Sequence, residues 1–285
     1  MAVDLRRHPG PAEGRARRRP AARLRPARRR RPRGTRHGPR WRTARLRQPL
    51  HSAPARRRER LHVDRVPGRP DHPQHNEMSY ADSWPATLFL TCLVPAATGG
   101  ETPVADSARV HARLPQATRE RFERHGVMYV RNFGHGMDLS WQEVFQTQDR
   151  AEVDAYCARH GIEAQWLGGE RLRTRHVVQA TLKARATGER VWFNQAHLFH
   201  VSSLPAHVES ELRADFAEDE LPRNALYGDG TPLDPEDLAH VRAAYAAEEI
   251  ALPWQAGDVM IVDNEQFSHG RNPYSGDRRV LVAMA

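Results

Sequence analysis

Hydrophobic and polar positions along the chain predict more strands than helices. The clearest strand is the apolar run ATLFLTCLV at 86–94, which ends at Pro95 and a glycine pair at 99–100. A short apolar run with such flanks is typical of a buried strand. Further strand patterns lie at 127–132, 174–182, 190–193, 257–263 and 279–283.

Helical patterns are fewer. Asp106 or Ser107 is expected to cap a helix that runs to Leu114, and Asp234 to cap one that opens with Pro235. The other helices are predicted at 114–125, 149–160 and 205–216, and a polar loop is predicted at 264–276. Strands and helices do not alternate regularly, so we predict a mainly β fold, an antiparallel sandwich or barrel with helical insertions.

The first quarter of the chain has a different composition. Residues 1–74 hold 24 Arg, five acidic residues and 11 of the 21 prolines, but no Phe, Tyr or Ile. Their net charge is 24 − 5 = +19, whereas the remainder, with 20 basic and 30 acidic residues, has −10, which sums to the formal +9. Such a segment cannot bury enough apolar area to offset the entropy of ordering, so we expect 1–73 to be disordered.

Cysteine content and hydropathy exclude other classes of protein. The two cysteines, Cys92 and Cys157, are too few for a disulfide scaffold and fit a reducing, cytoplasmic location. No run of about 18 apolar residues occurs, so no membrane span is expected. The basic N-terminus lacks the apolar stretch of a secretory signal. These sequence patterns do not indicate an oligomeric state.

A histidine two residues from a carboxylate occurs in His75-Asn76-Glu77. In extended backbone, residues two apart project to the same face, so both side chains can converge on one metal ion. His269 follows the apolar strand at 257–263. Two histidines and one carboxylate form the facial triad that leaves open positions on Fe(II) in non-haem oxygenases.

Four other residues are weaker candidates. Arg279 begins the last apolar strand, and its guanidinium could bind a carboxylate of a dicarboxylate co-substrate through paired hydrogen bonds. The alternative is that Arg279 is a solvated surface charge, as a lone arginine more often is. Trp192, Asn194 and His197 lie in the segment WFNQAHLFH. They are candidates for contact with substrate, and a place in the core is the alternative for each.

Several motifs in combination resemble the taurine dioxygenase-like (TauD/TfdA) superfamily, and within it the SyrP-like hydroxylases. The resemblance covers essentially all of 75–285. The motifs are HNEMSY (75–80), GGETPVADS (99–107), GVMYVRNF (126–133), WQEVFQT (141–147), WFNQAHLFHVSSL (192–204), LPRNALYGDG (221–230) and the DN and HGR of 263–271.

The resemblance implies a double-stranded β-helix (jelly roll) that binds Fe(II) and uses 2-oxoglutarate and O2. By position, His75, Glu77 and His269 are the implied iron ligands and catalytic centre. Arg279 and Thr102 are implied to hold the 2-oxoglutarate C5 carboxylate. The implied reaction is hydroxylation of a small or carrier-protein-tethered amino-acid-like substrate, with no membrane or specific nucleic-acid partner.

The family also implies further strands and helices before His75, where this chain has arginine and proline. A single Lys183 against 43 Arg indicates GC-rich coding DNA, whose other frames read mostly as Arg, Pro, Ala and Gly. We therefore hypothesise that residues 1–73 are an out-of-frame translation and that 74–285 is an N-terminally truncated dioxygenase domain. The nucleotide sequence of the gene tests this, since unrelated or stop-ridden adjacent frames would refute it.

Two alternative functions follow from the same segment. In the first, residues 1–74 are an Arg-rich arm that binds nucleic acid, with an affinity that falls steeply with salt. In the second, the chain is an inactive, frameshifted remnant of the dioxygenase. Iron-dependent turnover of 2-oxoglutarate distinguishes the enzyme from both.

Overall fold

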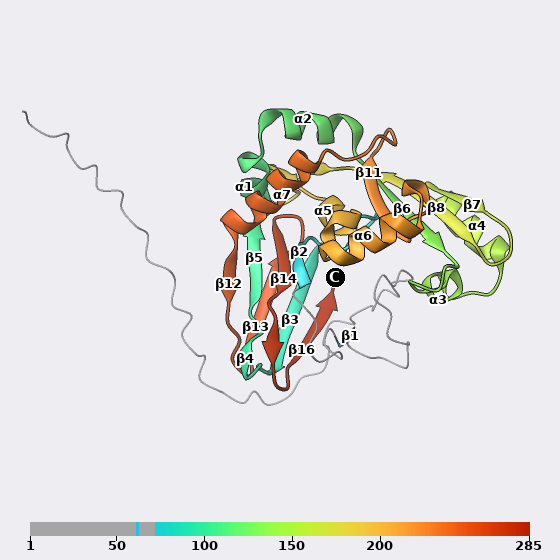
Figure 1. The fold of residues 1–285 in the computed structure, drawn as a ribbon. Helices are drawn as coiled ribbons and strands as arrows, with labels where there is room; N and C mark the ends of the chain where they lie inside the picture. Colours follow the sequence, from blue (N-terminus) through green and yellow to red (C-terminus); the bar gives the residue numbers. More distant parts are fainter. Residues whose placement is uncertain (1–60, 63–71) are drawn as a thin grey trace, which may run out of the picture. The chain divides into compact units, whose positions relative to one another are not determined.

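The computed structural model describes residues 61–62 and 72–285. Two four-stranded antiparallel sheets form its centre, with the orders β1-β16-β3-β13 and β12-β5-β14-β2 (Figure 1). Along the chain the strands pass repeatedly from one sheet to the other, which is the jelly-roll arrangement that the sequence analysis expected. The bounds are β1 Leu61–His62, β2 His72–His75, β3 Thr87–Val94, β5 Thr102–Asp106, β12 Ile250–Leu252, β13 Val259–Asp263, β14 Phe267–Arg271 and β16 Arg279–Met284.

Alternate residues of the first sheet's strands form a buried apolar cluster. Every second residue of β3 from Leu88 to Cys92 is buried, because successive side chains of a strand point to opposite faces. Trp254 packs against this cluster and donates its Nε1–H to Thr102 Oγ1 of the second sheet over 2.8 Å. The buried members are Leu88, Leu90, Cys92, Val262, Val280 and Val282.

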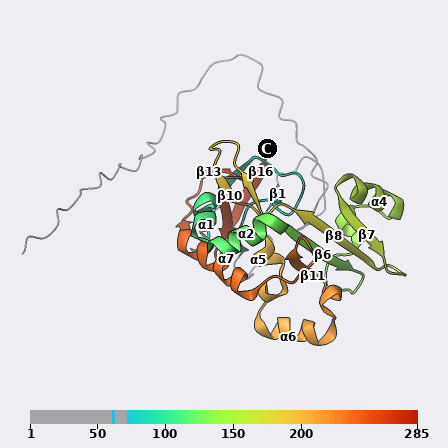
Figure 2. The same cartoon turned by 90° about the horizontal axis from the view of Figure 1, so that it is seen from above.

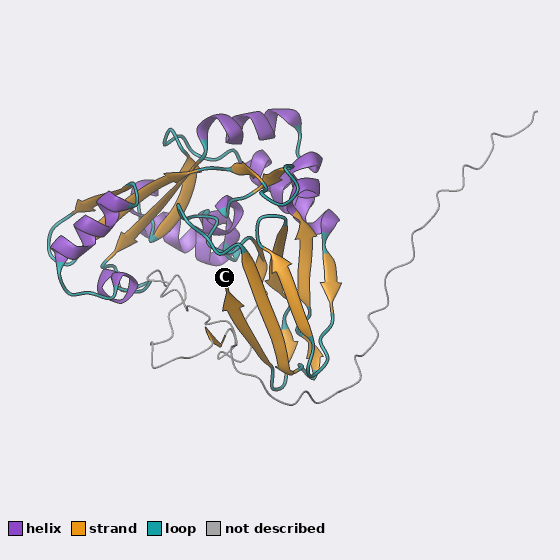
Figure 3. Ribbon diagram, turned by 180° about the vertical axis from the view of Figure 1, so that it is seen from behind, coloured by secondary structure: helices purple, strands orange, loops and turns teal. Residues whose placement is uncertain are grey.

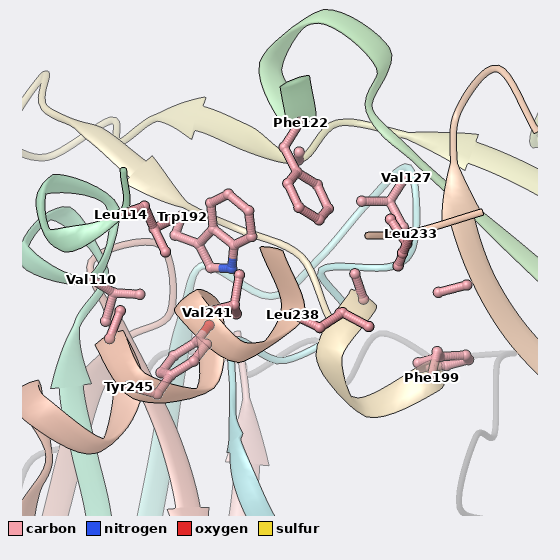
Figure 4. Close-up of a cluster of buried hydrophobic side chains, with 14 of the residues drawn as sticks. Val110, Leu114, Phe122, Val127, Trp192, Phe199, Leu233, Leu238, Val241 and Tyr245 are labelled. Atoms are coloured by element: carbon pink, nitrogen blue, oxygen red, sulfur yellow. The ribbon is translucent and has the colours of Figure 1, made fainter. Parts of the chain in front are cut away.

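A second core packs helices against the second sheet (Figures 3 and 4). It combines Ala105 of β5 with Phe122, Trp192 and Tyr245, and the rings of Phe122 and Trp192 meet edge to face at 4.9 Å. This core fixes the helices that lie at the upper end of the sheets in Figure 1. The helices are α1 Ser107–Arg113, α2 Gln116–His125, α5 Ala196–Phe199 and α7 Pro235–Glu248.

A third antiparallel sheet, of order β11-β6-β8-β7, extends from the helical end (Figure 2). Its strands are β6 Val127–Phe133, β7 Ile162–Trp166, β8 Leu172–Val178 and β11 Arg223–Tyr227. The remaining elements are β4 Thr98–Gly99, β9 Thr181–Lys183, β10 Arg190–Trp192, β15 Tyr274–Ser275, α3 Trp141–Phe145, α4 Arg150–Arg159, α6 Ala206–Asp215 and the 3-10 turns Val201–Ser203 and Glu218–Glu220.

Both predicted helix caps are confirmed. The Asp106 carboxylate accepts hydrogen bonds from the backbone of Ala108 and Arg109, and Asp234 caps α7 with Pro235 in its first turn. The helix predicted over 114–125 is shorter, because Leu114 adopts an extended conformation before Pro115.

The polar loop predicted over 264–276 is wrong, because this segment contains β14. Its sequence, FSHGR, lacks the apolar alternation of a strand, but hydrogen bonds to β5 on one side and β2 on the other hold it in the sheet. Most of the segment 1–73 lies outside the described residues. The predictions made for it, which are disorder, a changed reading frame and an arginine-rich arm, therefore lie outside them too. No helix in the described part of the chain has the length and apolarity needed to cross a bilayer.

Candidate metal centre

Three side chains predicted as metal ligands come together between the sheets. His75 ends β2 and pairs directly with His269 of β14. Glu77 Oε2 lies 4.0 Å from His75 Nε2 and 3.9 Å from His269 Nε2, and the two rings are 4.7 Å apart. The three potential ligand atoms all lie within 4.8 Å of one another. Residues almost 200 positions apart in the chain thus form one cluster of donors.

Glu77 reaches this cluster from a turn rather than from the expected extended strand. β2 ends at His75, and Met78 has the left-handed φ of 56°. The Asn264 amide fixes the turn: its Oδ1 accepts from the Glu77 N–H at 2.6 Å, and its Nδ2 donates to the Glu77 carbonyl at 2.9 Å. The turn and this amide together aim the carboxylate at the two imidazoles.

The hydrogen bonds and burial of the two histidines suit metal binding. His75 Nδ1 donates to the Pro73 carbonyl at 3.0 Å, which directs Nε2 toward Glu77. Burial, and then the neighbouring His75, lower the pKa of His269, so its imidazole is neutral. Two imidazoles and one carboxylate are the donor set of a non-haem Fe(II) site.

The backbone between the ligands is held by side chains from other elements. Gln195 Nε2 donates to the Asn76 carbonyl at 2.9 Å, and His197 Nε2 donates to the Gln74 carbonyl at 3.1 Å. Asn76 Nδ2 in turn donates to the backbone carbonyl of Asn264 at 2.8 Å. Carbonyls on both sides of His75 are therefore fixed before any metal binds, as a preorganised site requires.

Thr102 and Arg279 are the residues to which the resemblance assigns the 2-oxoglutarate carboxylate, and Arg278 directly precedes Arg279 in sequence. Thr102 is buried at the start of β5, and its Oγ1 accepts from Trp254, so the hydroxyl hydrogen remains able to donate. Arg279 is exposed at the start of β16, next to a shift in its register with β3. Arg278 is buried instead, and its Nε donates to the Gly100 carbonyl at 3.1 Å. Burial lowers the pKa of Arg278 to about 10.

The three candidate substrate residues are buried. Trp192 belongs to the helical core, and Asn194 uses its amide on the Ala180 carbonyl and the Ala196 N–H. His197 stacks on Tyr245 with ring centroids 4.7 Å apart. Their contact with substrate stays a prediction, and their present contacts give each of them a role in the core.

His197 is expected to make stability depend on pH. Burial lowers its pKa to about 3, whereas an unfolded histidine titrates near about 6.5. Below pH 6.5 the unfolded chain therefore binds a proton that the folded chain excludes, and stability falls by about 1.4 kcal/mol per pH unit. Urea unfolding at several pH values gives the free energy of unfolding as a function of pH. Between about pH 6 and pH 4, this free energy should fall less steeply for His197→Asn than for the unaltered protein, by about 1.4 kcal/mol per pH unit. Equal slopes in the two proteins would contradict a buried, neutral His197.

Sequence reasoning missed several residues of the site. It placed Asn264 only within the polar loop predicted at 264–276, and it did not single out Gln195, Trp254 or Arg278. A polar residue directly after the apolar strand at 257–263 was the available signal for Asn264. The side-chain contacts of Gln195 and Trp254 join positions far apart in the chain, so local patterns carried no signal for them.

Comparison with known proteins identifies relatives over most of the chain. The family model described as "Taurine catabolism dioxygenase TauD, TfdA family" matches residues 35–285, so the match begins within the segment 1–73. The dapdiamide synthesis protein DdaC of Enterobacter agglomerans is 41% identical over 210 residues, which cover 74% of this chain and 64% of DdaC. A clavaminate synthase-like protein of Arabidopsis thaliana is 33% identical over 179 residues, 59% of this chain and 50% of the relative.

This chain thus spans less than two thirds of the length of these relatives. Among solved structures, an asparagine oxygenase matches with a TM-score of 0.46 and 14% identity over 76% of this chain and 50% of its own. PvcB of Pseudomonas aeruginosa matches with a TM-score of 0.42 and 15% identity over 76% and 56%. The SyrP-like subgroup stays a prediction. The family match covers most of the sequence, and the chain belongs to the TauD/TfdA family of dioxygenases.

Proposed function

We propose that this chain is an Fe(II)- and 2-oxoglutarate-dependent oxygenase that hydroxylates an amino-acid-like substrate, either small and free or tethered to a carrier protein. The observation that carries the proposal is the convergence of His75, Glu77 and His269, with ligand atoms within 4.8 Å. The relationship to DdaC, a protein of dapdiamide synthesis, supports a substrate of the amino-acid class.

The residues of the site have separate roles in this proposal. His75, Glu77 and His269 would hold the iron, and a site of three protein ligands would leave room for 2-oxoglutarate and O2 to bind. When bound, Fe(II) couples oxidative decarboxylation of 2-oxoglutarate to oxidation of a substrate C–H bond. Thr102 donates its hydroxyl hydrogen to the far carboxylate of 2-oxoglutarate, and the sheet core around Trp254 keeps water away from it.

Succinate formation tests this function. The protein is incubated with Fe(II), O2 and 2-oxoglutarate, and succinate is measured with and without a chelator. We expect turnover that requires added Fe(II), since the donor set lacks thiolates and is suited to this ion. Succinate formation that is insensitive to removal of iron would contradict the proposal.

The two tandem arginines give a separate prediction about 2-oxoglutarate. The resemblance assigns the carboxylate clamp to Arg279, but the buried guanidinium beside Gly100 belongs to Arg278. We expect Arg278→Gln to raise the dissociation constant of 2-oxoglutarate by about tenfold or more, because a charge-assisted hydrogen bond is lost, and Arg279→Gln to change it little. Calorimetric titration of both variants with 2-oxoglutarate shows which arginine binds the carboxylate. A larger loss of affinity in Arg279→Gln than in Arg278→Gln would assign the carboxylate to Arg279.

A further inference from the structure

A chain of hydrogen-bonded side chains crosses the second sheet on the face away from the two candidate histidine ligands. The strands β2 and β14 lie side by side (Figure 1), with Gln74 directly before His75 and Ser268 directly before His269. Successive side chains of a strand point to opposite faces, so Gln74 and Ser268 lie on the opposite side of the sheet from the imidazoles. Both are buried there, with exposed fractions of 5% and 0%.

The side-chain amide of Gln74 makes a hydrogen bond at each end. Its Oε1 accepts from the Ser268 hydroxyl at 2.8 Å, and its Nε2 donates to Glu249 Oε2 at 3.1 Å. A carboxylate accepts hydrogen bonds, so Glu249 fixes which end of the amide faces it and directs Oε1 toward Ser268. Glu249 lies between α7 and β12. Because β12 and β2 are the two edges of the second sheet, these bonds connect one edge of the sheet with the other.

The backbone pairing of β2 with β14 is short and irregular beside the candidate ligands. β2 has four residues, and its register with β14 shifts between His269 and Arg271. Gly270 lies within this shift, where a Cβ would meet the His72 carbonyl oxygen at 2.6 Å. The strand sequences HPQH and FSHGR are largely polar on both faces, and strands of this kind specify their register weakly. A slip by one residue would turn the His75 side chain to the other face of the sheet.

We propose that Gln74 is a positioning residue of the metal centre, whose side chain locks the register of β2 against β14 and so sets the spacing of His75 and His269. This inference rests on the proposed function and adds a residue to the same site. Buried polar contacts are best known for specifying register, as a single buried asparagine does in coiled coils. Gln74 acts through the two histidines and takes no part in binding the iron itself.

Replacement of Gln74 by Glu is the first test. The variant keeps the size of the side chain and the acceptor for Ser268, but it places an oxygen instead of a donor against Glu249. Anaerobic titration should show Fe(II) binding weakened by about 10- to 100-fold, the usual cost of losing an outer partner of a metal ligand. The visible absorption of bound Co(II), which depends on the coordination geometry, should change as well.

An exchange of the two groups tests the hydrogen bond itself. The double variant Gln74→Glu with Glu249→Gln reverses the direction of the bond and again keeps the acceptor for Ser268. We expect its Fe(II) affinity to return to within about threefold of the unaltered protein, with the Co(II) spectrum restored. A merely structural role of Gln74 predicts a different result, in which stability falls and recovers while the Fe(II) affinity of the folded variants stays the same.

Glu249→Ala tests the same chain from its exposed end, where a substitution leaves the buried residues of the sheet in place. Loss of the acceptor should weaken Fe(II) binding by about 3- to 10-fold. Gln142→Glu is the matched control, because Gln142 of α3 donates to the Glu170 carboxylate at 2.7 Å in the same kind of pair. This variant should bind Fe(II) as the unaltered protein does.

The proposal is overturned if Glu249→Ala binds Fe(II) as tightly as the unaltered protein, or if the double variant binds it no more tightly than Gln74→Glu. Failure of the unaltered protein to bind Fe(II) would refute the proposed function instead. The register lock is then measured without metal, by hydrogen exchange of the backbone amides of β2 and β14. Their exchange should be faster in Glu249→Ala than in Gln142→Glu, and equal rates would refute the lock.

Discussion

Replacement of His269 by Ala is expected to abolish iron-dependent formation of succinate. The variant loses one of three ligand atoms that lie within 4.8 Å of one another. Loss of an outer partner of a metal ligand typically costs about 10- to 100-fold in affinity or activity, so loss of a ligand itself should cost more. Iron affinity and succinate formation, measured on the same preparation, should fall together.

A matched control is present in the same chain. His207 and Glu209 repeat the His-x-Glu spacing on α6, where residues two apart point in different directions around the helix. His207→Ala should therefore keep both iron binding and turnover. If it lost as much activity as His269→Ala, or if His269→Ala bound iron normally, the assignment of the centre would be wrong.

Asn264→Ala is expected to weaken both the metal site and the fold. The fully buried amide holds the N–H and carbonyl of Glu77 and also donates to the Pro85 carbonyl at 2.8 Å. Without it, buried backbone groups lose their partners, which should cost about 2–4 kcal/mol in the free energy of unfolding. Iron affinity should fall by about 10- to 100-fold, because Glu77 is no longer aimed at the imidazoles.

Urea unfolding and anaerobic Fe(II) titration measure these two effects. Asn272→Ala is the control, since Asn272 donates to Glu101 at 3.2 Å and, among the described residues, makes no hydrogen bond to the ligand turn. A folded Asn264→Ala protein with unchanged iron affinity would show that the turn positions Glu77 without this amide.

The elements with strong local signals were predictable from the sequence. The apolar run at 86–94 predicted the strand β3, of which every second residue from Leu88 to Cys92 is buried, and Asp106 and Asp234 cap helices through contacts with the next few residues. The candidate iron ligands could also be singled out from the sequence, because the chemistry limits the residue types and His75 lies close to Glu77; their role as ligands stays a prediction.

The rest of the site depends on contacts between distant parts of the chain. β14 has no strand pattern of its own and is a strand because β5 and β2 bond to it on both sides. The turn at Glu77 depends on Asn264, which lies 187 residues later. Burial alternates through residues 278, 280 and 282, so Arg278 lies on the inner face and Arg279 on the outer one, but the apolar run VLVAMA that follows does not show which face is packed against other elements.

A crystal structure of the protein with Fe(II), grown without oxygen, tests the central claim most directly. The account predicts one iron ion about 2.0–2.2 Å from His75 Nε2, His269 Nε2 and a carboxylate oxygen of Glu77, the range usual for such ligands. Iron bound elsewhere, or iron that contacts only one of these three residues, would contradict it.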